Sequence, residues 1–164
     1  MWEKNDIREI LISENEIQER AKQLGEQITK DYSSKKPLLV GLLRGSVPFL
    51  ADLMKNIDLD IQFDTMDVSS YEGTESVGEI RILKDLDTPV KGLDIILVED
   101  IVDTGRTLQT VKNTLLHRGA ASVTICTLLN KSARRTVDIQ ADYIGFEVAD
   151  EFVVGYGMDF NQKY

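Results

Sequence analysis

Residues 94–108 read DIILVEDIVDTGRTL, and this stretch decides the fold of the 164-residue chain. The unbroken apolar run from Ile95 to Val98 is typical of a strand that is buried on both faces of a parallel sheet. Two carboxylates, Glu99 and Asp100, follow the run, and a loop with hydroxyl groups and a glycine comes next. Apolar residues then recur at helical spacing from Leu108. The pattern predicts a buried strand, an acidic strand end, a polar loop and a helix.

The same order of strand, loop and helix occurs earlier in the chain. Residues 38–43 are a second buried-strand candidate, and residues 44–46 form a loop before a helical pattern with a proline in its first turn. Residues 121–129 predict a third buried strand, and helical spacing after a capping-box serine, Ser13, predicts a helix over residues 14–31. Further strand candidates are residues 61–68 and 142–149. This alternation favours an α/β fold, in which a parallel sheet has helices on both faces.

Length and composition are those of one globular domain. The chain has 164 residues, of which 42% are hydrophobic and 29% are charged. Its formal net charge of −9 argues against binding to nucleic acid, because no basic stripe is present. No apolar stretch approaches the length of a membrane span or forms a signal-peptide core, and Cys126 is the only cysteine. We therefore expect a cytoplasmic protein with no disulfide and no nucleic-acid or membrane partner.

The loop after the central strand suits a ligand that contains phosphate. Ligands of open α/β sheets bind at the carboxyl ends of strands, and the N-terminus of the following helix attracts anions. Three carboxylates, Glu99, Asp100 and Asp103, stand beside this anion site. The ligand must therefore also donate hydrogen bonds or recruit a cation, and a ribose 5-phosphate meets both requirements. The alternative is a strand, turn and helix with a solvated acidic loop, as in receiver-like domains.

The string VEDIVDTGRTL, residues 98–108, closely resembles the phosphoribosyl-pyrophosphate (PRPP) signature of type I phosphoribosyltransferases. The flanking sequence resembles the hypoxanthine-guanine branch of that family, above all EFVVGYGMD at residues 151–159. Four separated motifs appear in the family's order over nearly the whole chain. The resemblance implies the type I phosphoribosyltransferase fold as a single domain, residues 1–164. Its expected parts are a core over about 35–140, a hood from about 1–13 and 141–164, and a mobile lid over about 70–82.

The resemblance also assigns the site residues. The ribose-phosphate group is Glu99, Asp100, Asp103, Thr104, Gly105, Arg106 and Thr107. The pyrophosphate group is Leu43, Arg44, Gly45, Ser70 and Tyr71, with a cis peptide bond expected between Leu43 and Arg44. The purine group is Lys131, Phe152, Val153 and Asp159. The magnesium group is Glu99, Asp100 and, through water, Asp159.

The activity that the resemblance implies is purine salvage. The 5-phosphoribosyl group moves from PRPP to hypoxanthine or guanine, which gives IMP or GMP and pyrophosphate, and Mg²⁺ screens the polyanionic substrate. Asp103 is expected to be the general base for the purine proton, and Lys131 to hold the 6-keto oxygen. Phe152 is expected to stack on the base while the backbone of Val153 contacts its edge. Family members form homodimers or homotetramers, so the same is expected here.

Several alternatives stay open at this point. Xanthine is a possible third base, and a nucleotide-binding regulator on the same fold would be no enzyme; a complete set of base-site residues favours the enzyme. Residues 72–79 could be a plain surface hairpin instead of a lid, and Phe152 and Tyr156 could be an aromatic plug of the core. Family members usually continue past the position of Tyr164 with an arginine that contacts pyrophosphate. Without that arginine or a substitute cation, we expect weaker activity.

Overall fold

The computed structural model describes residues 11–70, 79–150, 153 and 155–158. In chain order, the elements are α1 (Glu14–Asp31), β1 (Leu38–Leu42), α2 (Val47–Met54), β2 (Gln62–Ser70), β3 (Ile80–Lys84), β4 (Asp94–Val102), α3 (Arg106–His117), β5 (Ser122–Asn130), the 3-10 helix η2 (Ser132–Arg134) and β6 (Tyr143–Glu147). None of the helices within these residues is long and apolar enough to cross a membrane.

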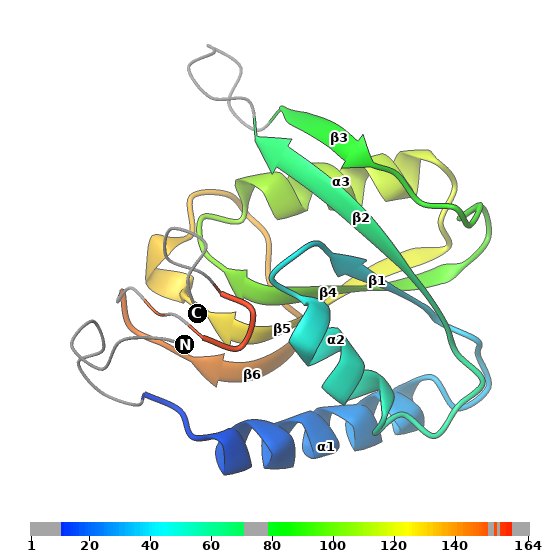
Figure 1. The fold of residues 1–164 in the computed structure, drawn as a ribbon. Coiled ribbons are helices and arrows are strands. Elements are labelled where there is room, and N and C mark those ends of the chain that lie inside the picture. Colours follow the sequence, from blue (N-terminus) through cyan, green and yellow to red (C-terminus); the bar gives the residue numbers. More distant parts are fainter. Residues whose placement is uncertain (1–10, 71–78, 151–152, 154, 159–164) are drawn as a thin grey trace.

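The strands form one six-stranded sheet in the order β3-β2-β1-β4-β5-β6 (Figure 1). Neighbouring strands are parallel except β2 and β3, which are antiparallel. The chain builds one half of the sheet outward from β1, and then returns to place β4 on the other side of β1. This reversal creates a crevice between the carboxyl ends of β1 and β4, where open α/β sheets bind their ligands.

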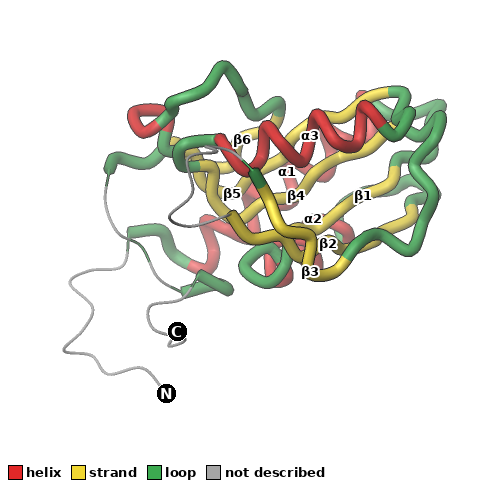
Figure 2. Tube along the Cα trace, turned by 90° about the horizontal axis from the view of Figure 1, so that it is seen from above, coloured by secondary structure: helices red, strands yellow, loops and turns green. Residues whose placement is uncertain are grey.

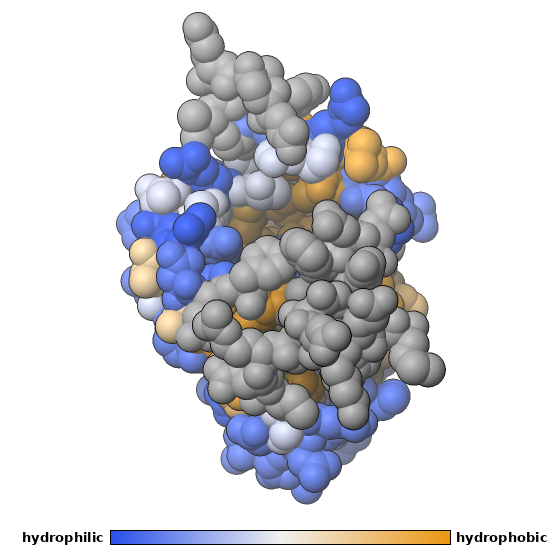
Figure 3. All heavy atoms as spheres, turned by 60° about the vertical axis from the view of Figure 1, so that its left-hand side comes forward, coloured by the Kyte–Doolittle hydropathy of each residue, from blue (hydrophilic) through white to orange (hydrophobic). Residues whose placement is uncertain are grey.

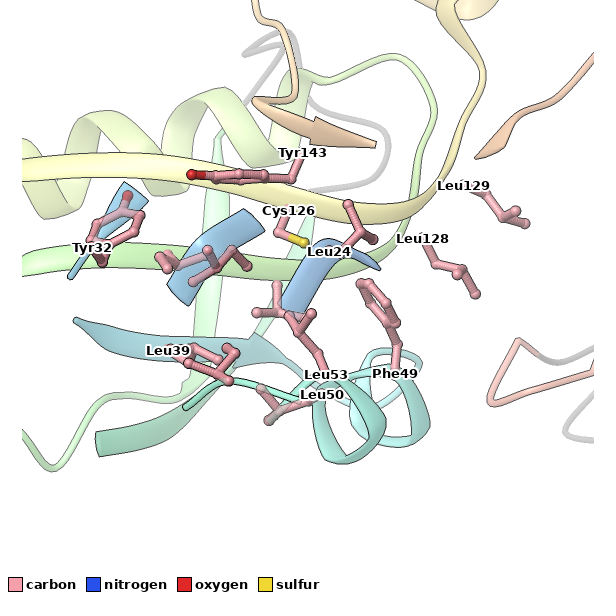
Figure 4. Packing of buried hydrophobic residues seen from close by; sticks show 14 residues of the cluster. Leu24, Tyr32, Leu39, Phe49, Leu50, Leu53, Cys126, Leu128, Leu129 and Tyr143 are labelled. Atoms are coloured by element: carbon pink, nitrogen blue, oxygen red, sulfur yellow. The ribbon is translucent and has the colours of Figure 1, made fainter. Parts of the chain in front are cut away.

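Helices cover both faces of the sheet, so the predicted α/β architecture is confirmed. Alternate residues of β4 belong to two different cores: Ile96 and Val98 lie in the cluster with α1 and α2, and Ile95 and Leu97 lie in the cluster with α3. Figure 2 shows α3 lying over the strands. Figure 4 shows the opposite core, where Leu24 of α1 and the α2 side chains meet the strands. An apolar run without alternation is what burial on both faces requires.

The predicted helix over residues 14–31 is confirmed, and its capping box forms in full. Glu16 N donates to Ser13 Oγ at 3.2 Å, and Ser13 N donates to Glu16 Oε1 at 3.1 Å. The central strand is longer than its apolar run. β4 continues through Glu99 and Asp100 to Val102, because β5 pairs with it up to Glu99 and again at Ile101 and Val102. The carboxylates therefore lie on the rigid strand itself and not in the loop that follows.

Two predicted parts of the domain, the hood and the lid, are described only in part. Of the C-terminal part of the hood, residues 141–150, 153 and 155–158 are described, and β6 within them pairs with β5 in the main sheet. Residues 11–13 belong to no strand, and residues 1–10 lie outside the described residues, so the hood stays a prediction. Residues 71–78 of the expected lid also lie outside them. The strands that flank this segment, β2 and β3, pair with Ser70 opposite Ile80, as in a hairpin. The division into core, hood and lid thus remains untested.

Candidate active site

A cavity of about 800 Å³ opens at the carboxyl ends of β1, β4 and β5. Its lining comprises Leu42, Leu43, Arg44, Gly45, Glu99, Asp100, Ile101, Asp103, Lys131, Val153, Gly157 and Met158. Figure 3 looks onto this edge of the molecule, where hydrophobic residues show at the centre and hydrophilic residues at the margins. Eight of the residues assigned from the sequence thus meet at one place, although they come from four separate parts of the chain.

The loop between β1 and α2 is fixed tightly against β4. The peptide bond between Leu43 and Arg44 is cis, as expected. The hydroxyl of Ser46 is fully buried and donates to the Leu42 carbonyl at 2.6 Å, which closes the turn. A Cβ atom at Gly45 would lie 2.2 Å from Asp100 Oδ2, so any larger residue there would displace this carboxylate. The predicted pyrophosphate loop therefore contacts one of the predicted ribose carboxylates.

Glu99 and Asp100 place two carboxylates side by side on β4. Asp100 N donates to Glu99 Oε1 at 3.2 Å, and Ile101 N donates to Asp100 Oδ1 at 2.8 Å. Burial, and then the hydrogen bond and negative charge of Asp100, raise the pKa of Glu99 well above its ordinary value. Because burial and mutual repulsion disfavour two charged carboxylates here, the pair favours a ligand that donates hydrogen bonds or brings positive charge.

The oxygen atoms of this pair also fit magnesium. Mg²⁺ is commonly held by one or two carboxylates, with waters and substrate phosphates completing its coordination. Among the residues that the structure describes, no group of three or more side chains gathers that could hold a metal by itself. Asp159, the third predicted ligand, lies outside them. Two carboxylates are sufficient for a magnesium ion whose other ligands are waters and substrate phosphates.

The loop before α3 has the backbone that an anion site needs. Gly105 has a φ of +85° at the N-cap of α3, and a Cβ atom there would strike Ile139 and Arg135. Arg106 N lies 3.4 Å from Thr104 Oγ1, so the threonine hydroxyl faces the start of the helix. The first N–H groups of α3 lack intrahelical partners and carry the positive end of the helix dipole. The residues assigned to the 5-phosphate thus lie at the start of α3 and do not line the cavity itself, and their role stays a prediction.

Asp103 is held by two arginines that the sequence reasoning missed. Arg134 Nε donates to Asp103 Oδ1 at 3.1 Å, and Arg135 Nε donates to the Asp103 carbonyl at 3.3 Å. Arg134 also lies 3.6 Å from Asp150, and the two carboxylates raise its pKa. The signal in the sequence was the pair of consecutive arginines that closely follows Lys131 at a strand end.

Lys131 is buried, unlike an ordinary lysine at a strand end. Its side chain lies at the cavity wall, and its backbone N–H donates to the Val102 carbonyl at 2.9 Å, which joins β5 to β4. The residues before and after Lys131 both bind the carboxylate of Glu147. Asn130 Nδ2 donates to Glu147 Oε2 at 2.7 Å, and Ser132 N donates to Glu147 Oε1 at 3.0 Å. The bonds from Ser132, more than that from Asn130, lower the pKa of Glu147.

The remaining assigned residues are described in part. Val153 lines the same cavity as Lys131, whereas Phe152 and Tyr71 lie outside the described residues. Ser70 is exposed at the end of β2. Tyr156 packs against the core of α1 and α2, as the aromatic-plug alternative predicted for it.

Comparison with known proteins gives consistent matches along the chain. A family model described as "Phosphoribosyl transferase domain" matches residues 6–161. The hypoxanthine-guanine phosphoribosyltransferase of Lactococcus lactis is 54% identical over 168 aligned positions, which cover 100% of this chain and 91% of the relative. That of Streptococcus pyogenes is 52% identical and covers 97% of this chain and 89% of the relative. A crystal structure of a hypoxanthine phosphoribosyltransferase from Staphylococcus aureus superposes with a TM-score of 0.94 at 48% identity, covering 98% of this chain and 88% of that one.

Proposed function

The chain belongs to the hypoxanthine-guanine branch of the phosphoribosyltransferase family, and from this premise we propose how its residues carry out the reaction. The enzyme transfers the 5-phosphoribosyl group of PRPP to hypoxanthine or guanine in purine salvage. The observation that carries the proposed roles is the meeting of Gly45, Asp100, Asp103 and Lys131 around one cavity.

PRPP binds across the crevice between β1 and β4. Its 5-phosphate lies on residues 104–107 at the start of α3, where backbone N–H groups and hydroxyls donate to it. Its ribose hydroxyls donate to Glu99 and Asp100. Its pyrophosphate lies on the loop that contains Gly45, where the lack of a Cβ atom lets the Asp100 carboxylate lie against the loop backbone.

The purine lies between Lys131 and the segment that begins at Val153. The ammonium of Lys131 donates to the 6-keto oxygen, because a lysine has three donors and no acceptor. Asp103 accepts the proton that the imidazole ring loses as the bond to the sugar forms. The pair with Arg134 holds the Asp103 carboxylate in the resting enzyme. The protein contributes mainly position and charge, because pyrophosphate leaves from an oxocarbenium-like sugar.

Magnesium is part of the proposal. Glu99 and Asp100 would hold it together with the substrate, and it would supply charge compensation for the departing pyrophosphate. The net charge of −9 supports this role, because a polyanionic substrate has to enter an acidic protein. Asp159 keeps its proposed role as a ligand through water.

A homo-oligomer, either dimer or tetramer, is also proposed. Phe63 on β2 and Leu83 on β3 are 61% and 57% exposed, and Val47 at the start of α2 is 47% exposed. Burial of these apolar side chains against another subunit would be favourable, which supports the proposal. Sedimentation analysis tests this; a monomer at all concentrations would contradict it. A cytoplasmic location likewise remains a proposal.

A panel of free bases with PRPP tests the function most directly. We expect turnover of hypoxanthine and guanine, little turnover of adenine, and release of pyrophosphate in equal amount. Xanthine, the alternative base, is the fourth member of the panel. No turnover of any base, with PRPP still bound, would favour the regulator alternative.

A further inference from the structure

The mechanism above gives no role to the turn at residues 155–158, although this turn has a well-defined backbone geometry. Gly155 and Met158 exchange two backbone hydrogen bonds, of 2.9 and 3.0 Å. The two residues between them, Tyr156 and Gly157, have φ angles of +50° and +92°. Positive φ at both central positions fits a type I′ turn. Tyr156 is the one non-glycine residue with positive φ within the described part of the chain, so an aromatic side chain stands where glycine or asparagine is preferred.

The side chain of Tyr156 ties this turn to α2. Its hydroxyl donates to Oδ2 of Asp52 and lies 3.3 Å from the carbonyl oxygen of Pro48. Burial and the bond to the Asp52 carboxylate raise the pKa of Tyr156 above its ordinary value, which keeps the hydroxyl protonated as a donor. The bond joins residues that are 104 positions apart in the sequence.

The acceptor is itself held in place. Gln18 Nε2 of α1 donates to the same Asp52 oxygen at 3.0 Å, and Lys55 lies 3.7 Å from the other oxygen. The Asp52 side chain is only 15% exposed. A hydrogen bond to a carboxylate in this setting is stronger than one between neutral groups, and a fixed acceptor gives it a defined direction.

The tip of the turn also touches the pyrophosphate loop. A Cβ atom at Gly157 would lie 2.6 Å from the carbonyl oxygen of Gly45 and 2.8 Å from Pro48 Cδ. The two backbones are therefore in direct contact at this point. Val153, which precedes the turn, and Met158, which ends it, both line the cavity.

We propose that Tyr156 is a positioning residue, whose bond to Asp52 holds the 155–158 turn on α2. The turn in turn fixes Val153 and Met158, which we call the purine wall of the cavity, against the pyrophosphate loop. The inference rests on the proposed function, because that function assigns the segment at Val153 to the purine. Loss of the hydroxyl frees the purine wall while the PRPP residues on β4 and α3 keep their places. The defect should therefore be larger in purine binding than in PRPP binding, to which the turn contributes only through its contact with Gly45.

Tyr156→Phe keeps the ring and removes only the hydroxyl. We expect the KM for hypoxanthine and guanine to rise roughly tenfold, the scale of one hydrogen bond to a charged group. We expect kcat and the Kd for PRPP to change much less, because the contact is lost equally in ground and transition states. Asp52→Asn keeps an acceptor oxygen but loses the charge, so its KM should lie between those of wild type and Tyr156→Phe, whereas Asp52→Leu should match Tyr156→Phe.

Tyr143→Phe is the matched control. The hydroxyl of Tyr143 donates to Asp31 Oδ2 at 2.6 Å, which is the same chemistry away from the cavity. It should lose comparable stability with no change in purine KM. Equal KM values in the two tyrosine variants would overturn the proposal.

Amide hydrogen exchange gives a second readout that does not need turnover. The N–H groups of Gly155 and Met158 bond within the turn, so they should exchange faster in Tyr156→Phe than in Tyr143→Phe. Unchanged exchange would also overturn the proposal. If the wild-type protein converts no purine, the proposed function fails, and the exchange comparison still decides whether Tyr156 holds the turn.

Discussion

Replacing Lys131 with methionine should remove most of the selectivity for 6-oxopurines over adenine. Methionine keeps much of the apolar stem and lacks the ammonium. Lys131 is 7% exposed and stands at the cavity wall. Its side chain lines the cavity, so a purine bound there can supply an acceptor to the ammonium.

The size of the effect follows from two contributions. A hydrogen bond to a charged group contributes about 1.5–3 kcal/mol, and a buried donor left without a partner costs about 1–3 kcal/mol. Hypoxanthine and guanine gain the hydrogen bond, whereas adenine presents a donor and leaves the ammonium without a partner. Together they amount to about 4 kcal/mol, or roughly a thousandfold in kcat/KM. In Lys131→Met the 6-oxopurines should lose roughly 30-fold or more and the penalty on adenine should vanish, so the ratio should fall below about tenfold.

The assay is steady-state kcat/KM for hypoxanthine, guanine and adenine at saturating PRPP. Lys36→Met is the control. Lys36 is exposed and pairs with Asp60 at 3.2 Å, and it precedes β1 at the amino ends of the strands, away from the cavity. This variant should leave the ratio unchanged. Wild-type protein that used adenine as readily as hypoxanthine, or a Lys131→Met enzyme that kept the full ratio, would refute the role of this side chain.

Three further predictions concern the carboxylates of β4 and its loop. Asp103→Asn should lower turnover roughly a hundredfold or more with PRPP affinity little changed, as measured by rapid kinetics and calorimetry; near-normal turnover would mean that another group accepts the proton. PRPP should bind more weakly when magnesium is removed, and equal affinity in chelator would eliminate the metal from the mechanism. Glu99→Gln should raise the melting temperature of the ligand-free protein more at about pH 8 than at about pH 5. Because the pKa of Glu99 is raised in the folded protein, the folded protein retains a proton at pH values where the unfolded chain has released it. The stability of the wild-type protein therefore falls as the pH rises, and the glutamine variant avoids that loss. A difference in melting temperature that did not grow with pH would contradict this.

Local patterns in the sequence determined the central elements of this protein. The apolar run at residues 95–98 predicted a doubly buried strand, because a parallel sheet between helices leaves no polar face. Ser13 and Glu16 predicted the start of α1, because capping bonds join residues three apart. The motif at residues 98–108 led to the family, and the comparisons confirm that family. All of these signals lie within one element and its flanking residues.

The arrangement of the site was decided only by the tertiary structure. The sheet order places β1 beside β4, and only this brings Gly45 against Asp100. The burial of Lys131, the arginine on Asp103 and the bond from Tyr156 to Asp52 likewise join separate elements. Periodicity and composition report which face of an element is buried, but they carry no information on which distant element covers it. These contacts depend on strand order, register and packing, and so they become visible only in the folded chain.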